Sequence, residues 1–186
     1  MKTWLIINGD DETALEQALK CETDALIINL YKRPVAAKAT TTRFVLAHKM
    51  VDSPSTLFVR ISPLAHENSS ADLDTVIKLA PTGIALAECE SGMDTQQLGS
   101  RLGVLEALNG VELGSTKIIG CIETASALLK MDSYKNASHR LVALIFNAKE
   151  LAENMGDLAA PVNTARELVL LGATAAGVLA IDGVYG

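Results

Sequence analysis

The stretch IIGCIETASALL (residues 118–129) shows the pattern that decides the fold of this 186-residue chain. It opens on an apolar run that begins at Lys117, passes through Glu123 and Thr124, and continues into a segment with helical spacing up to Lys130. An apolar run without alternating polar residues is typical of a parallel strand that is covered on both faces. The stretch therefore predicts a buried strand that ends in a carboxylate and is followed by a helix.

The same strand-then-helix pattern recurs along the chain. The predicted strands lie near Trp4–Ile7, Ala25–Ile28, Thr56–Val59, Gly83–Leu86, Lys117–Ile122, Leu141–Phe146 and Val178–Ile181. Helical spacing follows them in Thr13–Lys20, Val35–Met50, Leu73–Ala80, Leu98–Leu108 and Ala165–Ala176, with Ser70 and Asp94 as expected N-caps. Seven such repeats predict either an open doubly wound sheet or a TIM-type (β/α) barrel, in a single domain over residues 1–186.

Composition excludes several classes of function. The formal net charge of −6 argues against nucleic-acid binding, and the chain shows neither a membrane span nor an N-terminal targeting segment. The three cysteines, Cys21, Cys89 and Cys121, form no CxxC pair and are expected to be reduced thiols in a cytoplasmic protein. The chain contains no GxGxxG, Walker or GxSxG motif. No nucleic-acid or membrane partner is therefore expected.

Polar residues follow the predicted strands where a ligand site is expected. In either parallel architecture, the carboxyl ends of the strands form the site. Candidate substrate contacts at these ends are Asn8, Asn29, Arg60 and Asp182, and carboxylates follow the fourth to seventh strands. Clustered carboxylates suit Mg²⁺, and an arginine suits a substrate carboxylate. The alternative is that these residues are polar because loops are solvated.

Six segments in register resemble the HpcH/HpaI aldolase and citrate lyase β-subunit family. The most specific are IIGCIETASALL (118–129) and AGVLAIDGVYG (176–186), which resemble the family's Ile-Glu-Thr-Ala and Ala-Ile-Asp-Gly-Val-Tyr motifs. The others are LIINGDDETALEQALKCETDALIINL (5–30), LFVRISPL (57–64), GIALAECES (83–91) and ALIFNAKELAENMG (143–156).

This resemblance implies a TIM-type barrel and a Mg²⁺-dependent carbon–carbon lyase or aldolase. The substrate would be a hydroxy-acyl-CoA thioester or a hydroxy-oxo acid, cleaved through a metal-stabilised enolate. By motif match, Glu123 and Glu150 would be metal ligands. Arg60 would bind the substrate, and Arg60 and Glu123 would be the catalytic residues.

The chain also departs from the family pattern. The family's Asp-Leu-Glu-Asp after the second strand is here Asn29-Leu30-Tyr31-Lys32, and Glu88 stands in place of a family lysine. The sequence ends after the seventh strand, which predicts a truncated barrel with edges covered in a homo-oligomer or by domain swapping. Two alternatives therefore stay open: a catalytically degraded homologue that binds a ligand or partner, and an unrelated doubly wound domain without metal.

Overall fold

The structure, a computed structural model, describes residues 3–21, 23–50, 55–156 and 161–183. Within these residues, seven parallel strands form one sheet in the order β1-β2-β3-β4-β5-β6-β7. The strands are Trp4–Asn8 (β1), Ala25–Asn29 (β2), Thr56–Ile61 (β3), Gly83–Leu86 (β4), Lys117–Ile122 (β5), Leu141–Asn147 (β6) and Leu179–Gly183 (β7). A doubly wound sheet would reverse its strand order at a switch point, whereas this order follows the chain throughout. The fold is therefore the TIM-like α/β architecture, and the doubly wound alternative is wrong.

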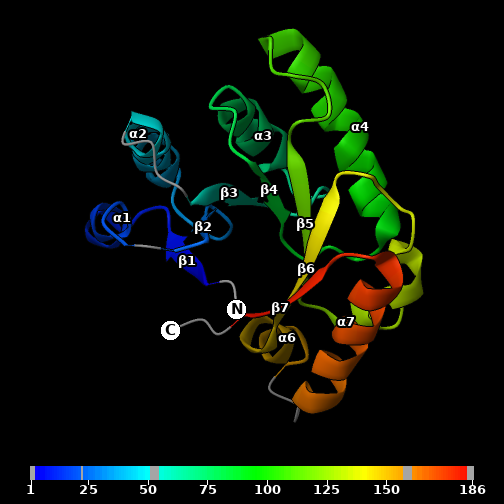
Figure 1. The fold of residues 1–186 in the computed structure, drawn as a ribbon. Helices are drawn as coiled ribbons and strands as arrows, with labels where there is room; N and C mark the ends of the chain where they lie inside the picture. The colour runs from blue at the N-terminus through cyan, green and yellow to red at the C-terminus, as the bar shows by residue number, and fades with distance from the viewer. Residues whose placement is uncertain (1–2, 22, 51–54, 157–160, 184–186) are drawn as a thin grey trace.

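The sheet curls into a partial barrel with the helices on its outer side (Figure 1). The helices are Glu12–Ala18 (α1), Ala36–Met50 (α2), Ser69–Ile77 (α3), Gly92–Asn109 (α4), Ala125–Leu128 (α5), Ala148–Asn154 (α6) and Val162–Ala176 (α7), with a 3₁₀ turn at Met131–Tyr134 (η1). Among the described residues, no strand pairing joins β1 to β7, so the barrel is open between these two strands. No helix within the described ranges is long and apolar enough to cross a membrane.

Two apolar layers hold the sheet. The inner layer consists of strand residues alone: Ile27, Phe58, Ala85, Ile119, Cys121, Ala143 and Ile145, with Trp4, Ile6, Val142 and Ile181 partly buried against them. The outer layer packs the other face of the strands on helix residues such as Leu73, Leu98 and Val169. Because side chains alternate along a strand, every second residue points into the barrel. This alternation decides which polar residues reach the interior at the carboxyl ends.

Two helix starts differ from the sequence prediction. The N-cap of α4 is Ser91, and Asp94 lies three residues further on, where its carboxylate accepts the N–H groups of Glu90 (2.8 Å) and Ser91 (3.0 Å). The N-cap of α3 is Asn68, so Ser70 lies inside the helix. Serine, aspartate and asparagine all cap helices well, so composition alone did not distinguish neighbouring candidates.

An ion pair lies at the amino ends of β5 and β6, away from the carboxyl ends of the strands. Arg140, just before β6, donates from Nη1 and Nη2 to the two carboxylate oxygens of Glu106 on α4, at 2.7 Å each. The backbone N–H groups of Gly114 (2.8 Å) and Thr116 (3.0 Å) also donate to this carboxylate. Burial disfavours the charged carboxylate, but these donors outweigh it and lower the pKa of Glu106 to about 2. The ion pair therefore connects α4 to the amino ends of β5 and β6.

Candidate active site

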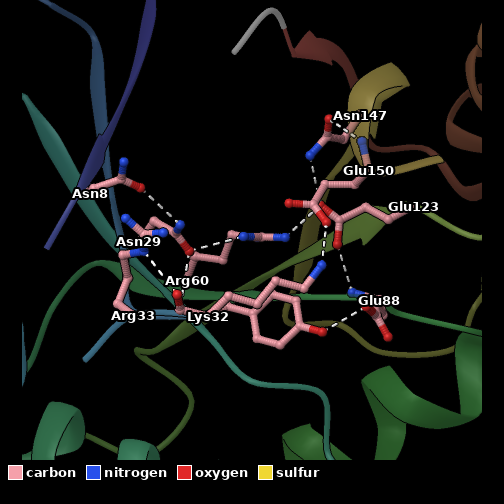
Figure 2. A network of polar contacts seen from close by, with 10 residues as sticks. Asn8, Asn29, Lys32, Arg33, Arg60, Glu88, Glu123, Asn147 and Glu150 are labelled. Atoms are coloured by element: carbon pink, nitrogen blue, oxygen red, sulfur yellow. Dashed lines mark hydrogen bonds and ion pairs between the residues drawn. The ribbon is translucent and has the colours of Figure 1, made fainter. Parts of the chain in front are cut away.

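Five side chains converge at the carboxyl ends of the strands (Figure 2). Asn8 ends β1, Asn29 ends β2, Arg60 lies near the end of β3, Glu123 directly follows β5 and Asn147 ends β6. Each lies two residues beyond a member of the inner layer (Ile6, Ile27, Phe58, Cys121 and Ile145, respectively). The two-residue period of the strands therefore turns all five into the barrel.

A buried ion pair between Arg60 and Glu123 forms the centre of this cluster. Arg60 Nη2 lies 2.7 Å from Glu123 Oε1, and the two side chains are 2% and 0% exposed. Separating such a pair would leave a charge buried without its counter-ion, which costs several kcal/mol. The pair therefore fixes the guanidinium and the carboxylate relative to each other.

Two further hydrogen bonds are donated to the Glu123 carboxylate. Asn147 donates from Nδ2 to Oε1 at 3.1 Å, and the backbone N–H of Glu88 donates to Oε2 at 2.9 Å. Glu88 adopts a left-handed conformation with φ of 45°. This conformation is unfavourable for a residue with a Cβ atom and is usually maintained by surrounding contacts at functional sites. Both oxygens of Glu123 thus have donors from the chain itself.

The second terminal nitrogen of the Arg60 guanidinium is bound by Asn29, which in turn contacts Asn8. Arg60 Nη1 donates to Asn29 Oδ1 at 2.9 Å, and Asn29 Nδ2 donates to Asn8 Oδ1 at 3.1 Å. Asn29 is buried, whereas Asn8 is exposed. The network therefore runs from the buried ion pair to solvent at the end of β1.

Tyr31 covers the guanidinium. Its ring lies over Arg60, with 5.0 Å between the ring centroid and Cζ, and its hydroxyl donates to Glu88 Oε1 at 2.7 Å. Burial, followed by the hydrogen bond to Glu88, raises the pKa of the Tyr31 phenol. Tyr31 is therefore a neutral hydrogen-bond donor at neutral pH, and any ligand that contacts Arg60 directly must share this space with its ring.

Lys32 and Glu150 form a second ion pair at the mouth of the site. Lys32 Nζ lies 2.7 Å from Glu150 Oε2, with the side chains 49% and 20% exposed. Glu150 is in the first turn of α6, where its backbone N–H donates to the Oδ1 atom of the N-cap Asn147 at 3.2 Å. Asn147 thus contacts both Glu123 and the backbone of Glu150. The buried and the exposed ion pairs are therefore held in one connected network.

The thiol beside this network is not a nucleophile. Cys121 is buried in the inner layer, and burial raises its pKa to about 12. The reactive form of cysteine is the thiolate, which is not populated at neutral pH with such a pKa. Burial and the raised pKa therefore disfavour nucleophilic chemistry at Cys121.

The network contains most of the predicted site residues. Arg60, Glu123, Asn8 and Asn29 lie in one chain of hydrogen bonds, and Glu150 joins it through Asn147. Asp182 lies outside it: its carboxylate pairs with Arg166 of α7 at 2.7 Å. Asp182 follows the inner-layer Ile181 by one residue, so the alternation of β7 turns it toward the outer helices. The roles predicted for these residues stay predictions.

Four members of the network were not among the predicted site residues: Tyr31, Lys32, Glu88 and Asn147. All four follow predicted strands, so the rule that identified Arg60 and Glu123 also applied to them. In the sequence, Tyr31 and Lys32 stand out only as departures from the family pattern, because a polar segment after a strand is commonly solvated. Their cross-barrel contacts depend on curvature, which the sequence pattern does not contain.

The donor set does not fit a resident Mg²⁺ ion. Mg²⁺ is usually bound by one or two carboxylates that are free to coordinate it, with water and substrate oxygens completing an octahedron. Glu123 accepts three hydrogen bonds, including that of the Arg60 guanidinium, and Glu150 is paired with the Lys32 ammonium. The residues expected to bind a metal are thus already paired with the chain's own cations.

A curled parallel sheet with this polar cluster at its carboxyl end defines a TIM-like protein with a strand-end site. The model of the HpcH/HpaI aldolase/citrate lyase family matches residues 2–186, and the chain belongs to this family. The citrate lyase subunit beta of Haemophilus influenzae is 24% identical over 191 residues, covering 99% of this chain and 66% of the relative. The chain therefore spans about two thirds of that relative's length.

Solved structures share the fold. Malate synthase of Haloferax volcanii, in a pyruvate/acetyl-CoA ternary complex, superposes with a TM-score of 0.82 at 16% identity, over 100% of this chain and 59% of that one. The CitE protein of Mycobacterium tuberculosis, in complex with magnesium, acetoacetate and coenzyme A, gives a TM-score of 0.71 at 21% identity, over 99% of this chain and 66% of that one. At these identities the similarity concerns the fold.

Proposed function

We propose that the protein is a carbon–carbon lyase or aldolase that acts on a small hydroxy or oxo acid, or on its CoA thioester, at the strand-end site. The observation that carries this proposal is the buried Arg60–Glu123 pair at the carboxyl ends of β3 and β5, in a chain of the aldolase/citrate lyase family. The acetoacetate and coenzyme A in the CitE complex support the same substrate class.

The cluster has the charges that such a reaction requires. Cleavage of a carbon–carbon bond next to a carbonyl leaves an enolate, and fixed positive charge beside its oxygen lowers the barrier. In this chain, Arg60 and Lys32 supply that charge, with Arg60 held rigidly by Asn29 and Glu123. The substrate hydroxyl must also lose a proton. Glu88 and Glu150 are partly exposed carboxylates at the mouth of the site and are the candidate bases.

The test is an activity screen on the purified protein. Hydroxy-acyl-CoA thioesters and hydroxy-oxo acids are offered with and without Mg²⁺, and the keto or acyl products are followed. We expect turnover of at least one substrate, lost by roughly a hundredfold or more in Arg60→Met, because one positioned charge in a dry site typically contributes this much. Arg43→Met is the control, since Arg43 is exposed and pairs with Glu12 away from the site. No turnover of any substrate by folded protein would contradict the proposal.

The second candidate is a homologue that binds such an acid without turnover. It is favoured by the Tyr31 ring over Arg60 and by Lys32 on Glu150, which fill part of the space that a substrate would use. If calorimetry shows that an oxo acid binds and the activity screen detects no turnover, this candidate is supported over the lyase.

We also propose that the protein is a cytoplasmic homo-oligomer. The exposed apolar side chain of Leu179 on β7, which is 49% exposed, supports self-association because a second copy of the chain could cover it. Light scattering after size-exclusion chromatography tests this assembly, and a monomer at micromolar concentration would contradict it.

A further inference from the structure

The carboxylates at the mouth and centre of the site are paired with cations from the chain. Glu123 faces the Arg60 guanidinium, and Glu150 faces the Lys32 ammonium at 2.7 Å. Figure 2 shows both cations pointing toward these carboxylates from the opposite side of the site. Arg60 is buried beneath the Tyr31 ring, so Lys32 is the more accessible of the two positive charges.

Lys32 is held in place by the fold. It adopts a left-handed conformation with φ of 57°, which is unfavourable for a residue with a Cβ atom. From the end of β2 its side chain crosses to α6, a partner 118 residues later in the chain. On the way Nζ passes 5.0 Å from the centroid of the Tyr31 ring. An unfavourable backbone conformation combined with an ion pair to a distant helix is typical of a residue with a positional role.

The protonation of Lys32 agrees with this geometry. Burial lowers the pKa of an ammonium, but the hydrogen bond and the charge of Glu150 outweigh it, so the pKa of Lys32 is raised. Glu88 and Glu153 contribute in the same direction. The side chain therefore carries a full positive charge at neutral pH.

We infer that the Lys32 ammonium is the resident cation of this site and that the site binds its anionic ligand without a divalent metal. The inference rests on the proposed function in taking the ligand to be a small acid. A tethered ammonium on Glu150 repels a divalent cation and occupies one of the oxygens that it would need. The same charge remains half exposed at the mouth, where it attracts a carboxylate or a developing enolate. Lys32 thereby becomes a specificity-determining residue of the site.

The first experiment measures Mg²⁺ binding by calorimetry, independently of any turnover. Wild-type protein is expected to bind no Mg²⁺ at millimolar concentration. Lys32→Asp removes the ammonium from Glu150 and reverses the charge at the mouth of the site, and it is expected to bind Mg²⁺ at least about tenfold more tightly than wild type. Lys149→Asp is the matched control, since it makes the same charge change at an exposed residue next to Glu150. Circular dichroism checks folding, and Lys32→Gln takes the place of Lys32→Asp if the latter does not fold.

The Mg²⁺ titrations distinguish a specific effect of Lys32 from a general effect of charge. Mg²⁺ binding that appears in the Lys32 variant, but not in wild type or Lys149→Asp, supports the inference. Wild-type binding as tight as that of the Lys32 variant overturns it. An equal gain in Lys149→Asp also overturns it, because the effect would then be one of general charge.

The second experiment titrates pyruvate in the presence of EDTA. Wild-type binding is expected to persist in EDTA and to weaken by roughly tenfold in Lys32→Gln, the scale of one charge-assisted contact. Wild-type binding that disappears in EDTA and returns with Mg²⁺ overturns the inference. If wild type and a panel of related acids show no binding under either condition, the proposed function fails, while the Mg²⁺ titration still decides the role of Lys32.

Discussion

Replacing Glu123 by glutamine should destabilise the protein strongly, although the side chain keeps its size. In the structure Glu123 Oε1 accepts from Arg60 and Asn147, and Oε2 accepts from the N–H of Glu88. A glutamine has one acceptor oxygen and one NH₂ group. If the oxygen faces Arg60, the NH₂ group faces the Glu88 N–H, and two donors oppose each other. In either orientation Arg60 loses its counter-ion while it remains buried.

The size of the effect follows from burial. The side chains of Arg60 and Glu123 are 2% and 0% exposed, so solvent does not compensate the lost charge. Removing one partner of a buried ion pair typically costs about 3–5 kcal/mol. Because the amide still accepts one hydrogen bond, we expect Glu123→Gln to cost about 3 kcal/mol in the free energy of unfolding.

Urea denaturation measures this cost. With a urea m-value of about 2 kcal/mol per molar, the midpoint should fall by about 1.5 M. Glu12→Gln is the control, because Glu12 pairs with Arg43 at the surface with both side chains well exposed, and it should shift the midpoint only slightly. A change of less than about 0.3 M in Glu123→Gln, at equal m-value, would show that the pair does not hold the strand ends together.

Two further predictions concern the Glu106–Arg140 pair and the Tyr31 hydroxyl. The pKa of Glu106 is lowered from 4.5 to about 2, so its pair with Arg140 stabilises the fold above about pH 4.5, and this stability is lost as the pH falls toward 2. Thermal melts should therefore show a smaller acid-induced loss of stability in Glu106→Gln than in wild type, with Glu112→Gln as the exposed control. Tyr31→Phe keeps the ring over Arg60 but loses the hydrogen bond to Glu88, and should cost about 1 kcal/mol by urea denaturation. Unchanged stability would show that the hydrogen bond from the Tyr31 hydroxyl to Glu88 does not contribute to the free energy of unfolding.

The fold could be predicted from local patterns. Seven apolar runs separated by helical segments predicted parallel strands, and all seven occur in the described sheet within one or two residues of the expected bounds. The choice between the two architectures needed the family resemblance, since strand order is a non-local property. Helix caps were less certain, as Ser91 and Asn68 show, because neighbouring polar residues compete for the same role.

The centre of the site was more predictable than its mouth. Arg60 and Glu123 lie at strand ends, two residues after the inward-facing Phe58 and Cys121. The two-residue period of a strand therefore already predicts that they face into the barrel. The same period shows why Asp182 was misplaced: it follows Ile181 by one residue and therefore faces Arg166 on the outside. The Lys32–Glu150 contact joins residues 118 positions apart, and depends on how tightly the sheet curls. That curvature is a property of the packed sheet as a whole.

The residues of the site differ in how closely they are tied to the strands. Asn29, Arg60 and Asn147 belong to strands, and Glu123 directly follows one, so moving any of them disturbs the barrel. Tyr31 and Lys32 lie just beyond β2, where a substitution leaves the strand pairing intact. Changes there alter the charge and the opening of the site at a smaller cost to the fold than changes at Arg60 or Glu123. Under the proposed function, the residues after β2 would therefore set which ligand and which cation the site accepts, while the Arg60–Glu123 pair would maintain the geometry of the strand ends.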